Sequence, residues 1–129
     1  MITLQEIKQW MQSNMDGVPV SIGEISEGSG RRAAIRTVKG TSAHAALGKS
    51  SSYGTLNVAI QYAQENEADA ESGAWQLYYL MKQASYIGAH AIKGIQMVYE
   101  YPLWIRNTSE GAAVFEAAAF IHYQKEEGE

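Results

Sequence analysis

The clearest alternation of apolar and polar residues in this chain lies near its middle, and it limits the fold more than any other feature. Within positions 55–62, larger apolar side chains occupy every second position. The apolar set is Leu56, Val58, Ile60 and Tyr62, and the set between them is Thr55, Asn57, Ala59 and Gln61. Because successive side chains of a strand point to opposite faces, the pattern predicts a strand with one buried face and one face in water. Such a strand requires a sheet that is covered on one side.

The first element predicted to cover the sheet is a helix near the start of the chain. Thr3 is a good N-cap, and Glu6 three residues later completes a capping box. An apolar stripe then recurs at helical spacing, formed by Leu4, Ile7, Met11 and Met15. Asp16-Gly17 supplies the stop.

A second helix is predicted after Asn66, which is a suitable N-cap. Its inward face is formed by Ala70, Ala74, Leu77, Met81 and Ala84. Three aromatic residues, Trp75, Tyr79 and Tyr86, fall on the opposite side. Aligned aromatic side chains on an outer face favour a partner surface. The alternative is a helix that is buried on two sides within its own domain.

The remaining apolar segments predict further strands at about 18–22, 32–38, 95–101 and 112–123. The last of these is expected to pair antiparallel with the one before it. Two stretches, Lys39–Gly54 and Leu103–Gly111, are predicted as loops. The predicted fold is therefore α+β, with a single mostly antiparallel sheet of about four to five strands and two helices packed on one face.

Composition limits the class of protein. A chain of 129 residues that is 46% hydrophobic is expected to form one globular domain, residues 1–129. No apolar run approaches the ~20 residues of a membrane span, and the first residues lack the pattern of a signal peptide. The absence of cysteine excludes disulfides and thiol chemistry and fits a reducing cytoplasm.

The charge distribution argues against a protein that grips nucleic acid. The formal net charge is −4, and the basic residues cluster at Arg31, Arg32 and Arg36 alone. Strand spacing places Arg32 and Arg36 on one face and Arg31 on the other. We interpret the cluster as a solvated strand edge that is protected by charge.

No residue pattern predicts an active site, a metal site or a cofactor site. The segment Ala46-Leu-Gly-Lys-Ser50 ends like a phosphate-binding loop, but Ala43 stands where that motif needs glycine. The histidines His44, His90 and His122 are too far apart in sequence to suggest a zinc site. We therefore expect a protein that is not an enzyme.

Several short sequence segments resemble those of the minor capsid, tail-terminator or tail-completion proteins of long-tailed bacteriophages. They are Val18-Pro-Val-Ser-Ile-Gly-Glu-Ile25, Lys39-Gly-Thr, Ala46-Leu-Gly48, Ser52-Tyr53, the acidic start of the second helix, and residues 110–124 with their acid-aromatic alternation. The resemblance spans nearly the whole chain. It implies a structural protein of the virion tail, made in the host cytoplasm, that forms a six-membered ring at the head-proximal end of the tail tube.

The resemblance also implies partners. The ring would contact the tail tube protein and the head-tail connector or stopper protein, while DNA passes through it without sequence readout. The residues expected to form contacts are Leu47, Lys49, Trp75, Tyr79, Leu103, Trp104 and Arg106. Two alternatives stay open. One is a head-tail stopper or tube protein, and the other is a small α+β ligand-binding or enzymatic domain.

Overall fold

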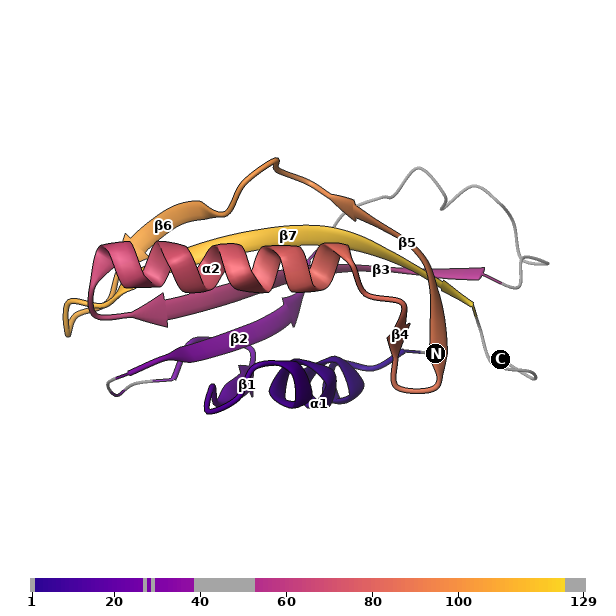
Figure 1. Cartoon of the computed structure of the whole chain (residues 1–129), viewed down its shortest axis with the longest axis horizontal. Helices are drawn as coiled ribbons and strands as arrows, with labels where there is room; N and C mark the ends of the chain where they lie inside the picture. The colour runs from indigo at the N-terminus through magenta and orange to yellow at the C-terminus, as the bar shows by residue number, and fades with distance from the viewer. Residues whose placement is uncertain (1, 27, 29, 39–52, 125–129) are drawn as a thin grey trace.

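The computed structural model describes residues 2–26, 28, 30–38 and 53–124, and at Tyr53 it describes the backbone alone. These residues form an α+β fold with two helices and one curled, half-barrel sheet (Figure 1). The elements in chain order are α1 (Leu4–Asn14), β1 (Val20–Ile22), β2 (Arg32–Thr37), β3 (Tyr53–Gln64), α2 (Glu67–Lys82), β4 (Tyr86–Ile87), β5 (His90–Met97), β6 (Leu103–Asn107) and β7 (Ala113–Gln124).

The sheet is built around its two longest strands, β3 and β7, which pair antiparallel over twelve residues each. The strand order is β1-β2-β3-β7-β5-β4, and β6 also pairs with β7. All pairs are antiparallel except β1 with β2. The predicted α+β class and the mostly antiparallel sheet are confirmed, as is the antiparallel pairing of β7 with β5.

The predicted number of four to five strands is wrong, because the described residues form seven. The prediction missed β4, which has only two residues, and β6, which lies inside the stretch 103–111 that was predicted as a loop. It also placed Tyr86 on the second helix, whereas α2 ends at Lys82 and Tyr86 begins β4. Short edge strands leave too few alternating residues for a pattern to stand out from a loop.

The basic cluster is not a solvated strand edge, which corrects the interpretation of Arg31, Arg32 and Arg36. β2 lies between β1 and β3, and its residues 33–35 are paired on both sides. Arg32 is only 2% exposed, and its guanidinium donates to the carbonyl oxygens of Ser26 and Gly30. It therefore fastens the segment between the parallel strands β1 and β2. Arg36 forms an ion pair with Glu116 of β7 at 3.2 Å, on the same face as Arg32.

Both helices begin where the sequence predicts. Thr3 and Glu6 form the predicted capping box of α1, and Asn66 accepts a hydrogen bond from the Asp69 amide at the start of α2. α1 contacts β1, β2 and β4, while α2 covers β3 and β7 (Figure 1). Buried residues of both helices belong to one core cluster with residues of β2, β3 and β7. No helix in the described part of the chain is long and apolar enough to cross a membrane.

The predicted wet face of β3 is only partly in water. Ala59 is fully buried and Gln61 is 8% exposed, although both point away from the helices. Ala59 is paired with Arg36 of β2, and the Arg36 side chain extends to Glu116 of β7. The long Arg36 side chain and Glu116 therefore shield the small Ala59 side chain from water, although no helix or second sheet covers this face in the described part of the chain.

Candidate interaction surface

Partly and largely exposed aromatic residues occur on three parts of the chain: α2, the β5–β6 connection and β6. We call these residues together the aromatic surface, and they are Trp75 and Tyr79 of α2, Tyr99 and Tyr101 of the connection, and Trp104 of β6. Four of these side chains, all except Trp75, are between 45% and 55% exposed. On α2, the rings of Trp75 and Tyr79 are stacked with centroids 5.3 Å apart. Aromatic residues are enriched at protein–protein interfaces, so the area exposed here is unusual for a lone subunit.

Tyr78 joins α2 to the 98–102 connection between β5 and β6. Its ring packs edge-on against Trp75 and Tyr79, and its hydroxyl donates to the carbonyl oxygen of Tyr99 at 2.8 Å. Burial raises the pKa of the Tyr78 hydroxyl, and the Glu100 carboxylate and Tyr79 raise it further. The hydroxyl therefore keeps its proton and holds the 98–102 connection against α2.

The aromatic surface lies beside an open edge of the sheet. Within the described residues, β6 pairs with β7 alone, and β5 has β4 on its second side only at residues 90 and 91. The Ile92 amide still donates to the Ser85 carbonyl oxygen, but β6 and residues 93–97 have no strand beside their outer edge in the described part of the chain. An exposed edge of this kind is a template for pairing with another chain.

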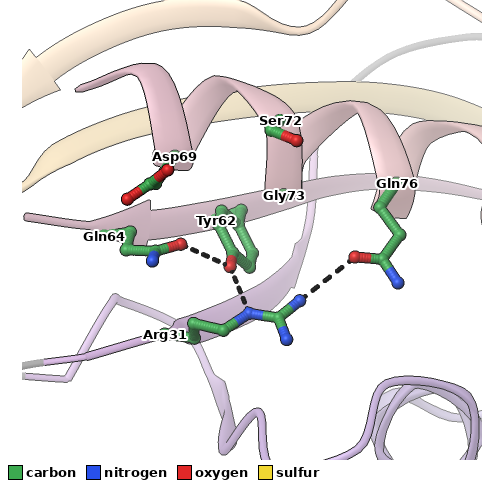
Figure 2. A pocket seen from close by; sticks show the side chains of 7 residues that line it. All are labelled: Arg31, Tyr62, Gln64, Asp69, Ser72, Gly73 and Gln76. Atoms are coloured by element: carbon green, nitrogen blue, oxygen red, sulfur yellow. Dashed lines mark hydrogen bonds between the residues drawn. The ribbon is translucent and has the colours of Figure 1, made fainter. Parts of the chain in front are cut away.

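The opposite flank of α2 carries a polar hollow of about 220 Å³ instead (Figure 2). Its side chains come from α2, from β3 and from the residue before β2, and they are Arg31, Tyr62, Gln64, Asp69, Ser72 and Gln76. We call this site the polar hollow. Sequence reasoning missed it, because Arg31 and α2 are separated by more than thirty residues and only the β2–β3 pairing brings them together.

Arg31 is held in place by neutral groups. Its Nε donates to the Tyr62 hydroxyl at 2.6 Å, and its Nη2 donates to Oε1 of Gln76 at 3.1 Å. The Tyr62 hydroxyl in turn donates to Oε1 of Gln64 at 2.9 Å (Figure 2). This arrangement presents a fixed guanidinium to an incoming acceptor, and a carboxylate is the partner that suits its fork geometry.

The glycine at position 73 makes the polar hollow possible. A Cβ atom at Gly73 would lie 2.3 Å from the Tyr62 ring, which no side chain could tolerate without a shift of that ring. Glycine inside a helix costs about 1 kcal/mol relative to alanine. Here that cost allows a buried tyrosine to pass under α2 and to place its hydroxyl beside Arg31. A glycine inside a helical pattern was the signal in the sequence that could have pointed to this site.

The contact residues predicted from the sequence are only partly brought together. Trp75, Tyr79 and Trp104 lie on the helix side, since Trp104 is paired with the core residue Phe115. Leu103 and Arg106 are paired with Glu116 and Val114 and point to the other face of the sheet. Leu47 and Lys49 lie outside the described residues, as do His44 and residues 46–50, whose sequence was compared with a phosphate-binding motif.

Nowhere among the described residues do three or more His, Asp or Glu side chains gather in a way that could hold a metal ion. His90 is buried, with Nδ1 3.3 Å from the Gln124 carbonyl oxygen and Nε2 3.6 Å from Glu6. His122 shares a hydrogen bond with Thr55. Both histidines therefore have contacts within the fold.

No family model and no curated protein matches this chain.

Proposed function

We propose that this protein is a structural component of a virion, which assembles into a ring at the head-proximal end of the tail of a long-tailed bacteriophage. In that position it ends the growth of the tail tube and joins the tail to the head. The identification of the particle rests on the sequence resemblance. The proposal that the chain assembles rests on the aromatic surface beside an open sheet edge.

The aromatic surface is large enough to matter energetically. A Trp or Tyr side chain buries about 150–250 Å², so four that are half-exposed could bury about 300–500 Å² more. A standard interface buries about 800 Å² per partner. The aromatic surface would therefore supply about half of one contact, and the adjoining edge of β5 and β6 would supply backbone hydrogen bonds to the rest.

Assembly is tested with the purified chain over a range of concentrations, by sedimentation velocity and by negative-stain electron microscopy. We expect closed rings of uniform size. Open filaments would favour the alternative role of a tube protein, because a tube subunit continues to add copies. A monomer at all concentrations would contradict the proposal.

A pair of tyrosine variants controls for general effects of surface change. Tyr79→Ala alters the aromatic surface and is expected to raise the concentration at which half of the chains are assembled. Tyr86→Ala removes a tyrosine that is somewhat more exposed, at 63% against 51% for Tyr79, but belongs to β4. It is expected to assemble like the unaltered protein. Equal effects of the two variants would show that the aromatic surface has no special part in assembly.

The alternative of a small-molecule binding domain has one observation in its favour, which is the polar hollow. Binding sites for small molecules are mostly apolar and measure about 300–1,000 Å³. The polar hollow is smaller, open to solvent and lined by polar side chains. Those properties favour a role in contact with another polar surface.

A further inference from the structure

We infer that the polar hollow receives the 98–102 connection of a second copy of this chain, with the Glu100 carboxylate of one copy against the Arg31 guanidinium of the next. The inference rests on the proposed ring and names the two surfaces that would meet in it.

Within residues 2–26, 28, 30–38 and 53–124, no carboxylate forms an ion pair with Arg31. Among the described residues, the carboxylate of Glu116 pairs with Arg36, and the carboxylate of Glu6 lies 3.6 Å from Nε2 of His90. Asp69 lines the polar hollow too, but it forms no ion pair with Arg31. Two neutral acceptors orient the guanidinium, and the remaining N–H groups can take a bidentate partner.

Glu100 is an exposed carboxylate on a connection that is already ordered. It lies between Tyr99 and Tyr101, and the hydrogen bond from Tyr78 holds the backbone beside it. A charged group that is fixed before binding loses little conformational entropy on contact. The two tyrosines would exclude water around the carboxylate, as rim residues do around an interface hot spot.

The polar hollow and the 98–102 connection lie on opposite flanks of α2, so they cannot meet within one copy. Gln76 contacts Arg31 on one flank, and Tyr78 contacts Tyr99 on the other. A contact between two different surfaces is heterologous, which means that each copy gives one surface and receives the other. Repetition of such a contact closes into a ring when the rotation from one copy to the next divides a full turn evenly. The placement of these two surfaces therefore fits the ring that the proposed function requires.

Charge reversal tests the pair. Arg31→Glu and Glu100→Arg are each expected to raise the half-assembly concentration by about tenfold or more, because like charges would face each other at the contact. An equal mixture of the two variants is expected to assemble again. In alternating order, one contact keeps the original pair and the next has both charges reversed, so every contact is attractive. An isologous contact through the aromatic surface alone would not give this rescue.

Two further variants keep the result interpretable. Asp16→Arg makes the same change of charge as Glu100→Arg on an exposed turn after α1, and it is expected to assemble normally. Ser72→Glu places a carboxylate in the polar hollow from an exposed helix position, without removing any hydrogen bond of Arg31. It is expected to weaken assembly as Arg31→Glu does, while thermal unfolding stays unchanged.

The outcomes separate this inference from the proposed function. If the unaltered chain forms rings and the charge-reversed variants also do, the pairing of Glu100 with Arg31 is wrong and the ring stands. If the mixture fails to assemble while Asp16→Arg assembles, the pairing is wrong as well. Saturable binding of free glutamate, abolished by Arg31→Glu, together with normal assembly of Glu100→Arg, would assign the polar hollow to a small carboxylate instead. A chain that never assembles overturns both proposals.

Discussion

The two flanks of α2 are built from the same helix but differ in how they use their side chains. On the flank of the polar hollow, Tyr62 is buried beneath Gly73 and its hydroxyl joins Arg31 and Gln64. On the other flank, the aromatic rings of Trp75 and Tyr79 stack on each other, and about half of Tyr79 remains exposed to water. The first flank thus packs against the core through a buried tyrosine, whereas the second flank leaves apolar surface exposed.

This difference separates stability from assembly. Side chains that are buried and hydrogen-bonded contribute to folding, because their removal leaves a cavity or an unpaired polar group. Side chains that are half exposed contribute little to folding and retain area for a partner. We therefore expect changes of buried, hydrogen-bonded side chains to lower stability, and changes of exposed side chains on either flank to lower assembly. Three predictions test that distinction.

The largest effect is expected at Tyr62. Tyr62→Ala should lower the free energy of unfolding by about 3–5 kcal/mol, as truncation of a buried aromatic side chain does. Tyr62→Phe keeps the ring and should cost about 1 kcal/mol, because it removes only the hydrogen bonds of the hydroxyl. Urea unfolding measures both values. A loss below about 1 kcal/mol for Tyr62→Ala would show that this flank is not tied to the core.

The second prediction concerns Trp104 on β6. Trp104→Ala should change the free energy of unfolding by no more than about 0.5 kcal/mol, because the side chain is about half exposed. The same change should raise the half-assembly concentration by about tenfold, as loss of an interface aromatic residue does. Sedimentation velocity and urea unfolding measure the two effects.

A matched control for Trp104 is Trp10, which packs partly buried against the core from α1. Trp10→Ala should lower stability more than Trp104→Ala does, with no selective effect on assembly. If Trp104→Ala unfolds the protein, then Trp104 belongs to the core and the distinction between the flanks fails on β6.

The smallest effect is expected at Tyr78, which links α2 to the aromatic surface. Tyr78→Phe should lower the free energy of unfolding by about 1 kcal/mol, because the hydrogen bond to the Tyr99 carbonyl is lost.

The effect of pH on Tyr78 follows from its raised pKa. The stabilising contribution is fully present below the ordinary pKa of 10.0, since the hydroxyl is then neutral in both states. It is lost as the pH rises from there through the raised pKa of the folded state. The stability difference between the unaltered protein and Tyr78→Phe should therefore shrink above pH 10. A difference that is constant or grows in this range would contradict the burial of the hydroxyl.

Helix starts and the buried face of β3 were predicted correctly, because the residues that determine them lie close together in the sequence. The capping box of Thr3 and Glu6 and the N-cap at Asn66 each join residues three positions apart, so the sequence contains both partners. The alternation around Val58 and Ile60 identified the buried face of β3 for the same reason. These features follow from the geometry of a single helix or strand.

The predictions that failed depend on contacts between distant residues. Arg31 looked like a surface charge, and only the pairing of β2 with β3 places it beside Tyr62. The segment Leu103–Asn107 looked like a loop, and it becomes a strand because β7 offers it a partner over residues 113–116. Strand formation depends on the neighbouring strand more than on the propensity of the segment itself.

By itself, the sequence determined the class of fold, the positions at which the helices start, and which side chains of β3 face the core. Tertiary structure alone decided that β1 runs parallel to β2, that β7 has three neighbouring strands, and that Arg31 lines a polar hollow beside α2. The physical reason is that the apolar periodicity of a segment identifies the face that will be buried. The same periodicity does not specify which distant segment will pack against that face.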